Sequence, residues 1–413
     1  MRKIIASLDI GDSHIKLVVG EIVRNKLNVL ACVEVPSRGI KKGFVVNPES
    51  TIESLKDVFS KANEAIGINI RKVIINVPSN NAECFLSEGY TTISGEEKFV
   101  TNNDVIRAMQ SCVYNKIEDN KELVTILPTK FMINDIDIVD NPVGMNAEKL
   151  NVKAVAVTVP KKNVNNIIRC LERINVEVVD IALGALGDYY QFKDRNMDSS
   201  VGAIVNIGAA KTEVAIFNKG TLTSVEVIDI GGDNVDYDLG YVYKINRRDA
   251  IYLKENMALA DKNMAQPTES QVFETKNGDK VKVNQFDASE VVMSRLQEIL
   301  NLAKKQINLL TKKQISYIII TGGMTEIVEF ASLVEKMFST ASVGSVTEVG
   351  ARNNKYSTAV GLIKYYDSRL RLRNKDFSVF TIEEQEDLSG IHKKVNISED
   401  SILGKLFGYF FDN

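Results

Sequence analysis

The sequence predicts an α/β fold built from two similar lobes, and two observations lead to this prediction. The chain of 413 residues is too long for one ordinary hydrophobic core, yet it has enough apolar residues to form several. Residues 6–11 also match residues 203–208, at an offset of 197 residues, and both copies lie at the same point of an apolar strand, a glycine turn and a second strand. We therefore expect a duplicated fold with a related hairpin in each lobe.

The first lobe is expected to comprise residues 1–83 and 174–200. It opens with β-branched strands around the turn Gly11-Asp12-Ser13, followed by a helix over residues 48–66 and a buried strand at 73–77. From residue 84 to residue 173 the chain changes to short strands and helices. We expect this stretch to form an inserted subdomain with its own small core.

The second lobe is expected to have its core at residues 201–240 and 311–366, with a further subdomain at 241–310. The segment at 317–323, YIIITGG, is typical of a buried strand that ends in a glycine pair. Residues 367–400 are charged and poor in large apolar side chains, which predicts a flexible linker. Residues 401–413 are apolar again.

Composition excludes several classes of function. A net charge of −3 and interspersed charges provide no basic face, so we expect no nucleic-acid partner. The two histidines and four cysteines show no metal-type spacing, which argues against a zinc site or a histidine-dependent triad. Because no apolar run reaches the roughly 20 residues that span a bilayer, we expect the protein to stay in the cytosol.

Three glycine turns form the candidate site. A nucleotide triphosphate requires close backbone N–H groups, hence glycines, and a carboxylate that organises Mg²⁺ through its water shell. Asp9 would orient the metal and Gly208 would face the phosphates from the second lobe. The other candidates are Gly11 and Ser13 for the phosphates, Lys16 for their charge, and Gly322 and Gly323 for a purine. Each turn alone is also typical of an ordinary hairpin.

The order of these turns resembles that of the actin and sugar-kinase superfamily, whose phosphate and adenosine motifs are matched by SLDIGDSHIK, AIVNIGAAKTEV and IIITGGMTEI. Within that superfamily the chain is most similar to the FtsA family of bacterial cell-division proteins. The similar segments are SRGIKKGFVVN, INVEVVDIALGAL, DIGGDNVDYDL and RNNKYSTAVGL. The insertion also lies where FtsA carries its distinctive subdomain.

This resemblance implies an actin-like, two-lobed fold with an FtsA-type inserted subdomain, and ATP with Mg²⁺ held between the lobes. It implies self-association into filaments, binding of the C-terminal peptide of FtsZ, and attachment of the FtsZ ring to the inner face of the cell membrane. It also implies that Lys254 reaches the ribose, although Ile251 stands where an acidic residue is usual and Asp249 is not expected to reach.

One departure concerns the metal. Asn206 stands where the family's second phosphate turn usually has Asp, and a neutral amide offers no charge to hydrated Mg²⁺. Lys211 in the same turn either offsets phosphate charge or faces solvent. We therefore expect ATP binding with weak or absent hydrolysis.

The C-terminal segment predicts an amphipathic helix. Its large apolar residues recur on one helical face and are Ile402, Leu403, Leu406, Phe407, Phe410 and Phe411. A helix of about 12 residues is about 18 Å long, which is too short to span a bilayer but suits its interface. The alternative is a helix that packs on the protein itself or on another copy, but the charged segment before it favours a membrane anchor.

Three other functions remain as alternatives. A phosphotransferase of the sugar-kinase branch would need an Asp base, for which no residue is convincing. An adaptor similar to the pilus-assembly protein PilM shares the same kind of core, but such adaptors reach the membrane through a partner. A chaperone-like ATPase would need a substrate-binding second half that this chain lacks.

Overall fold

The computed structural model describes residues 3–95, 97–385 and 387–388. The first lobe contains a sheet of five strands in the order β11-β6-β1-β2-β3. Strands β1, β2 and β3 form an antiparallel meander, and β6 and β11 continue the sheet in parallel. Their bounds are β1 Lys3–Ile10, β2 His14–Val23, β3 Lys26–Pro36, β6 Lys72–Val77 and β11 Glu177–Leu183.

The second lobe repeats this topology in the order β14-β13-β12-β17-β18. Again an antiparallel meander is followed by two parallel strands. The bounds are β12 Val201–Ile207, β13 Thr212–Asn218, β14 Thr221–Ile228, β17 Tyr317–Thr321 and β18 Ala341–Val343. The predicted duplication is therefore confirmed.

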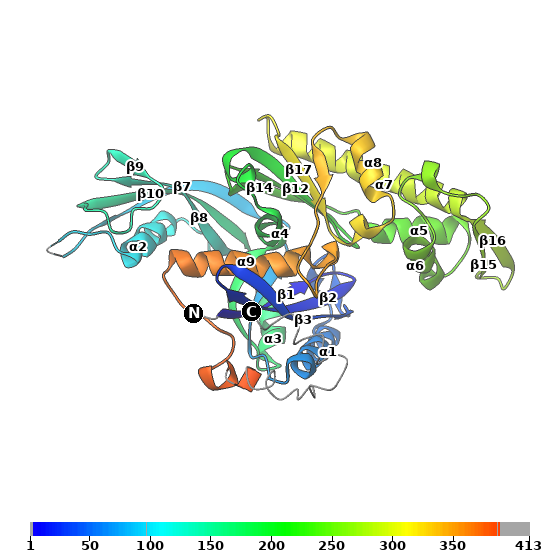
Figure 1. The fold of residues 1–413 in the computed structure, drawn as a ribbon, viewed down its shortest axis with the longest axis horizontal. Helices are drawn as coiled ribbons and strands as arrows, with labels where there is room; N and C mark the ends of the chain where they lie inside the picture. Colours follow the sequence, from blue (N-terminus) through cyan, green and yellow to red (C-terminus); the bar gives the residue numbers. More distant parts are fainter. Residues whose placement is uncertain (1–2, 96, 386, 389–413) are drawn as a thin grey trace, which may run out of the picture.

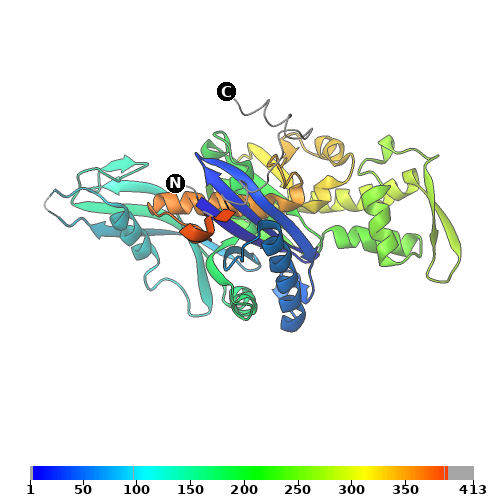
Figure 2. The ribbon, with the colours of Figure 1, turned by 60° about the horizontal axis from the view of Figure 1, so that its bottom comes forward.

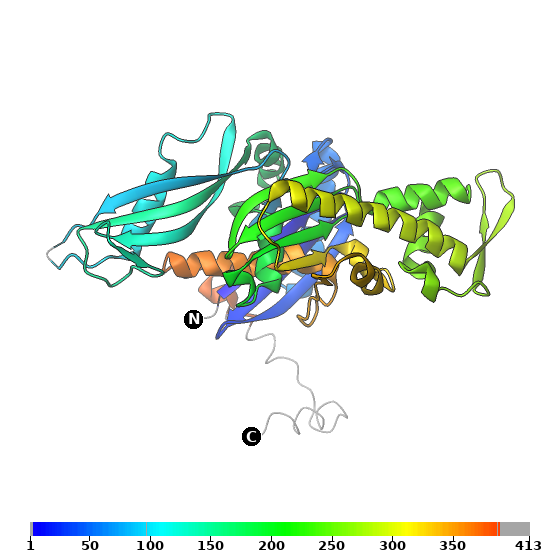
Figure 3. The ribbon, with the colours of Figure 1, turned by 90° about the horizontal axis from the view of Figure 1, so that it is seen from above.

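Helices cover both faces of each sheet (Figure 1). Helices α4 (Gly184–Phe192) and α9 (Ser357–Leu372) lie between the two sheets. Helices α1 (Pro48–Ile66) and α3 (Lys162–Glu172) lie on the outer side of the first sheet (Figure 2), and α7 (Gln285–Leu310) and α8 (Phe330–Met337) on the outer side of the second (Figure 3). Helix α1 has the predicted bounds, and its ends are capped: Asn47 accepts a hydrogen bond from the Ser50 N–H, and Gly67 ends the helix at φ 81°.

Helices α4 and α9 cross at unusually close range. A Cβ atom on Gly361 would lie 1.8 Å from the carbonyl oxygen of Gly187, and one on Gly187 would lie 2.6 Å from that of Thr358. No side chain fits at such distances. The two glycines therefore allow direct backbone contact between α4 and α9, the helices that lie between the lobes.

The inserted subdomain is a four-stranded sheet, β7-β10-β8-β9, with one helix packed on it. Its elements are β7 Glu83–Thr92, α2 Asn102–Val113, β8 Lys121–Ile133, β9 Asp137–Val139 and β10 Lys149–Pro160. It has a separate core, as predicted. The predicted end at residue 173 was wrong, however, because α3 buries Val164, Ile167 and Leu171 in the core of the first lobe.

A second subdomain extends from the other lobe, at the opposite end of the elongated molecule (Figure 1). It consists of α5 (Gly232–Val242), α6 (Arg247–Asn256), the hairpin of β15 (Ser270–Glu274) and β16 (Lys280–Asn284), and part of α7. The remaining short elements are β4 Ile40–Lys41, β5 Phe44–Val45, η1 Met197–Ser199, η2 Lys262–Met264, η3 Gly323–Glu326 and η4 Asn354–Tyr356.

The predicted linker begins too early. Helix α9 continues to Leu372, and Asp367 within it is buried and paired with Lys3 at 2.9 Å. Val379 and Phe380 are buried against the first lobe, where the Val379 N–H donates to the Ile4 carbonyl oxygen at 2.8 Å. The segment has few large apolar residues, but these few are enough to hold it.

Residues 389–413 lie outside the described residues, and so do the six predicted membrane residues Ile402, Leu403, Leu406, Phe407, Phe410 and Phe411. Among the helices that the structure describes, none combines the length and the apolar character needed to cross a membrane.

Candidate functional site

A cleft of about 590 Å³ lies between the lobes and is lined by both of them. All nine residues predicted to bind a nucleotide line this cleft: Asp9, Gly11, Ser13, Lys16, Asn206, Gly208, Lys254, Gly322 and Gly323. Residues that lie up to 314 positions apart in the sequence thus face one space.

The two glycine turns are built alike. The Gly11 N–H donates to the His14 carbonyl oxygen at 3.2 Å, and the Gly208 N–H donates to that of Lys211 at 3.0 Å. Within the described part of the chain, the N–H groups that follow each glycine, those of residues 12–13 and 209–210, donate no hydrogen bond. Free N–H groups from two facing turns suit an anion such as a phosphate.

Asp9 lies at the carboxyl end of β1 and is 7% exposed. Its Oδ2 is 2.8 Å from Lys16 Nζ, and its Oδ1 accepts a hydrogen bond from Asn76 Nδ2 at 2.7 Å. Asn76 also accepts from the Ile10 N–H at 2.7 Å, which holds the amide in place. Asn76 was not among the predicted residues, because its contact with Asp9 depends on β6 lying beside β1 in the sheet.

Asn206 lies at the equivalent point of β12. Its Nδ2 donates to Asp188 Oδ2 at 2.7 Å and to Thr358 Oγ1 at 3.2 Å. Burial raises the pKa of Asp188 to about 7. Asp188 was also missed, because an acid in the otherwise apolar helix α4 gives no sequence signal for a site.

The Gly322 turn requires glycine. Gly322 has φ 98°, and a Cβ atom there would lie 2.5 Å from both Asn206 Oδ1 and the Ile207 carbonyl oxygen. Beside it, a Cβ atom on Gly232, at the start of α5, would lie 2.4 Å from Met324 Sδ. Glycines at 322 and 232 thus let the turn pack closely on β12 and α5, whereas a Cβ atom on Gly323 would have its nearest neighbour, Lys355 Cβ, at 3.8 Å.

Lys254 does not stand alone. Its Nζ lies 2.7 Å from Asp236 Oδ1, and both side chains are less than 10% exposed. Burial raises the pKa of Asp236. Asn246 caps α6 by accepting a hydrogen bond from the Asp249 N–H at 2.9 Å. Asp249 does not line the cleft, whereas Ile251 does. The acidic residue beside Lys254 therefore comes from α5, which the spacing within α6 could not indicate.

Further charged groups surround the cleft. Lys211 lines it, beside Glu213. Lys355 near the start of α9 pairs with Glu34 of the first lobe at 2.6 Å, and Lys42 pairs with Asp229 of the second lobe at 2.7 Å. Among the described residues, no group of three or more His, Cys, Asp or Glu side chains is suited to hold a metal ion.

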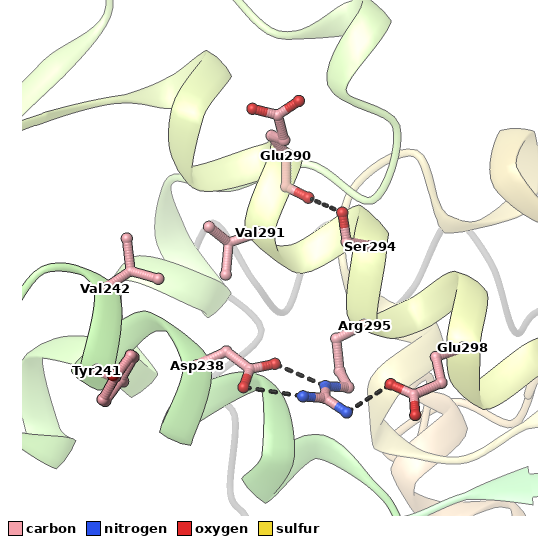
Figure 4. A pocket seen from close by; sticks show the side chains of 8 residues that line it. All are labelled: Asp238, Tyr241, Val242, Glu290, Val291, Ser294, Arg295 and Glu298. Atoms are coloured by element: carbon pink, nitrogen blue, oxygen red, sulfur yellow. Dashed lines mark hydrogen bonds and ion pairs between the residues drawn. The ribbon is translucent and has the colours of Figure 1, made fainter.

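A second hollow of about 350 Å³ lies between α5 and α7 (Figure 4). We call it the α5–α7 groove; it is lined by Asp238, Tyr241, Val242, Glu290, Val291, Ser294, Arg295 and Glu298. The Arg295 guanidinium donates to both oxygens of Asp238, at 2.6 and 3.0 Å, and also pairs with Glu298. At its rim, the rings of Tyr237 and Tyr241 stack 6.3 Å apart and are 71% and 75% exposed.

Family models match two parts of the chain. Residues 203–361 match the model of the cell division protein FtsA, and residues 79–158 match the SHS2 domain inserted in FtsA. The second match ends before α3, in agreement with the placement of that helix in the first lobe.

Curated relatives carry the same description over most of their length. Cell division protein FtsA of Bacillus subtilis is 28% identical over 92% of this chain and 87% of its own length. The FtsA proteins of Pseudomonas aeruginosa and Escherichia coli are 29% and 25% identical, over 88% of this chain and 89% and 90% of their own lengths.

Solved structures share the fold. A PilM–PilN type IV pilus biogenesis complex contains a chain that matches with a TM-score of 0.58 and 15% identity, over 87% of this chain and 98% of that one. An MreB protein of Spiroplasma citri bound to ADP matches with a TM-score of 0.55 and 13% identity, over 90% and 99%. The fold is therefore actin-like.

Proposed function

This chain belongs to the FtsA family of cell-division proteins, and from this premise we propose that it is a filament-forming adaptor that binds ATP with Mg²⁺ and tethers the FtsZ ring to the cytoplasmic membrane. The observation that carries the proposal is the convergence of all nine expected residues on one cleft between duplicated hairpins.

The cleft supports nucleotide binding through its backbone. The N–H groups of Asp12 and Ser13 from one lobe, and of Ala209 and Ala210 from the other, can donate to phosphate oxygens together. A ligand held from both sides would fix the lobes relative to each other. The ADP complex of the similarly folded MreB protein supports the same kind of ligand here.

Mg²⁺ would neutralise part of the triphosphate charge, and Asp9 would orient its water shell. Lys16, which now pairs with Asp9, can turn its amine to the phosphates. Asn206 supplies no charge on the opposite side, so rapid hydrolysis has little support. We expect the nucleotide to act as a structural ligand that sets the lobes for assembly.

The proposed membrane attachment rests on the amphipathic pattern of Ile402, Leu403, Leu406, Phe407, Phe410 and Phe411. A single short helix would bind lipid weakly and reversibly. Many copies along a filament would bind far more firmly, because each bound helix raises the effective concentration of the next. Self-association would therefore control attachment at the inner face of the membrane.

We place the partner peptide in the α5–α7 groove. Two stacked, exposed tyrosines beside an apolar floor of Val242 and Val291 form the kind of patch that marks a protein interface. Asp238 and Glu298 already pair with Arg295, and Glu290 pairs with Lys262, so we expect apolar residues of the peptide to make the main contacts in the groove. The C-terminal peptide of FtsZ is the partner expected for this family.

The pilus adaptor is the remaining alternative with an observation behind it, namely the fold shared with PilM. That likeness has 15% identity and bears on the fold alone, whereas the relatives matched along the chain are division proteins. A sugar-kinase activity has no comparable support, since the relatives matched along the chain are division proteins.

Electron microscopy on a lipid monolayer tests the proposal. With Mg·ATP and anionic lipid, we expect the full chain to form filaments on the monolayer, and Asp9→Ala to form none. A chain ending at Asp400 should still form filaments in solution but leave the monolayer bare. Equal lipid binding by both lengths would refute the anchor, and filaments of the Asp9→Ala protein that match the wild type would refute the metal role.

A further inference from the structure

A buried carboxylate lies directly behind the cleft. Asp188 on α4 is completely buried and accepts hydrogen bonds from three neutral donors: Asn206 Nδ2 at 2.7 Å, Ser357 Oγ at 2.7 Å and Thr358 Oγ1 at 2.9 Å. Ser357 also accepts from Thr321 Oγ1 at 3.0 Å. Asp188 lies on α4 of the first lobe, Asn206 and Thr321 lie on β12 and β17 of the second lobe, and Ser357 and Thr358 lie on α9 between the two sheets. The cluster therefore connects both lobes through α9.

The cluster fixes the direction of the Asn206 amide. Its Nδ2 points back to Asp188 and Thr358, so Oδ1 points the other way, beside the Gly322 turn that lines the cleft. Within the described residues, the side chain of Asn206 makes its hydrogen bonds through Nδ2, and no group donates to this Oδ1. An amide turned by 180° would instead present N–H donors to the cleft, where a metal-bound water also offers hydrogens.

We propose that Asp188 is a positioning residue for the nucleotide's metal: it holds Asn206 so that Oδ1 accepts a hydrogen bond from a water bound to Mg²⁺. This inference rests on the proposed binding of Mg·ATP. Asn206 stands where related turns have Asp, and it cannot supply a charge to the metal. Its amide oxygen can still accept a hydrogen bond from a metal-bound water, as a carboxylate oxygen does.

The residue type at position 188 matters for this role. An ionised carboxylate only accepts, so three donors can converge on it without conflict. An asparagine in its place would bring two N–H donors of its own against the amide of Asn206 and the hydroxyls of Ser357 and Thr358. The turn has no negative charge at Asn206, but the ionised side chain of Asp188 places one directly behind the Asn206 amide.

Few charged groups face Asp188. Glu213 on β13 raises its pKa in addition to burial, while Asn206 on β12, Ser357 and Thr358 on α9, and Thr321 on β17 are neutral. The charge of Asp188 can therefore change with pH near neutrality. This change would reach the cleft through Asn206.

The test compares affinity for Mg·ATP and for ATP with EDTA, by calorimetry between pH 6 and pH 8. Asp188→Asn should weaken Mg·ATP binding at pH 8 by about tenfold, the size expected for one hydrogen bond to a charged group, and change metal-free binding less than twofold. The wild type should lose Mg·ATP affinity as the pH falls, and Asp188→Asn and Asn206→Ala should lose less of it. His14 and the nucleotide phosphates are present in all variants, so their contribution cancels in the ratio of the wild-type affinity to the variant affinity at each pH.

Two controls keep the test specific. Asp104→Asn changes another buried acid, in the inserted subdomain, and should leave both affinities unchanged. In an Asn206→Ala background, Asp188→Asn should have no further effect, because Asp188 acts through Asn206. If Asp188→Asn fails to fold, the difference in pH profile between the wild type and Asn206→Ala still decides the matter.

The outcomes separate the two proposals. A wild type that binds no ATP overturns nucleotide binding and this inference with it. A wild type that binds Mg·ATP, with Asn206→Ala showing the same affinity and pH profile, overturns the positioning role alone. Equal losses for Mg·ATP and metal-free ATP in Asp188→Asn would also overturn it, because they would indicate a general structural role.

Discussion

Asp9 and Asn206 occupy the same position in the two duplicated hairpins, but the residues opposite them on the second strand of each hairpin carry opposite charges. Asp9 is in register with Lys16 on β2, whereas Asn206 is in register with Glu213 on β13. The first hairpin therefore has an acid on its first strand and a base on its second, and the second hairpin has an amide and an acid. A shared backbone cradle thus carries two different electrostatic environments, one on each side of the cleft.

At the same scale, Asp188 should make stability depend on pH. Its pKa is raised from an ordinary value of 3.8 to about 7, mainly by burial, so the folded protein holds this proton over a range in which the unfolded chain has lost it. Stability from this group is then present at low pH and is lost as the pH rises through 7. At about 1.4 kcal/mol per pH unit, the loss is at most about 4 kcal/mol.

Chemical denaturation at pH 5, 6, 7 and 8 measures this effect. Relative to the wild type, Asp188→Asn should gain stability from pH 5 to pH 7 and little more by pH 8, where folded Asp188 is ionised as well. A constant difference between the two proteins across this range would contradict the assignment. Other titrating groups contribute equally to both proteins.

Most of the nine cleft residues could be predicted because glycine turns and an acid next to apolar strands form a local pattern, whereas Lys254 in α6 was expected only from the family resemblance. Asp188, Asp236 and Asn76 could not, because their role depends on which distant segment lies opposite them. The same limit explains the errors in domain bounds: α3 has an amphipathic face, but the sequence does not state whether the first lobe or the insertion covers it. The fold class was accessible because duplication repeats a pattern along the chain.

At the scale of elements, the crossing of α4 and α9 controls how the lobes meet. Gly361→Ala would place a methyl group 1.8 Å from the Gly187 carbonyl oxygen, so the helices must separate. We expect a loss of about 3 kcal/mol or more, in the range of severe overpacking. The measurement is the shift in thermal unfolding.

Gly240→Ala in α5 is the matched control for that change. A Cβ atom there has its nearest neighbour at 3.5 Å, an ordinary contact, and alanine favours a helix by about 0.5–1 kcal/mol over glycine. The control should therefore be neutral or slightly more stable. Equal destabilisation by both substitutions would argue against close packing as the reason for Gly361.

The α5–α7 groove belongs to the same scale, because two helices form it. Tyr241→Ala should weaken binding of the FtsZ C-terminal peptide about tenfold or more, as expected for an aromatic residue central to an interface. Tyr114→Ala, at a tyrosine that is also 75% exposed but lies at the end of α2, should not change the affinity. Fluorescence anisotropy with labelled peptide measures both, and equal effects would rule out the groove.

At the scale of the whole molecule, the cleft is where a ligand can act on both lobes. Hydrogen exchange measures which parts of the two lobes are protected when the ligand binds. Mg·ATP should slow exchange at residues 10–14, 208–211 and 322–326, which form its walls. Helix α2 packs in a separate core and should exchange at unchanged rates. Equal protection of α2 would indicate that the nucleotide tightens the entire chain.

Val379 and Phe380 are docked on the first lobe, and Leu388 is the last residue that the structure describes. From Leu388, about a dozen residues lead to residue 401, and at no more than about 3.6 Å each they reach roughly 43 Å. If the terminal helix rests on lipid, this tether sets a ceiling on the gap between the bilayer and the first lobe. A filament would then run close to the membrane with the same side of every subunit turned toward it.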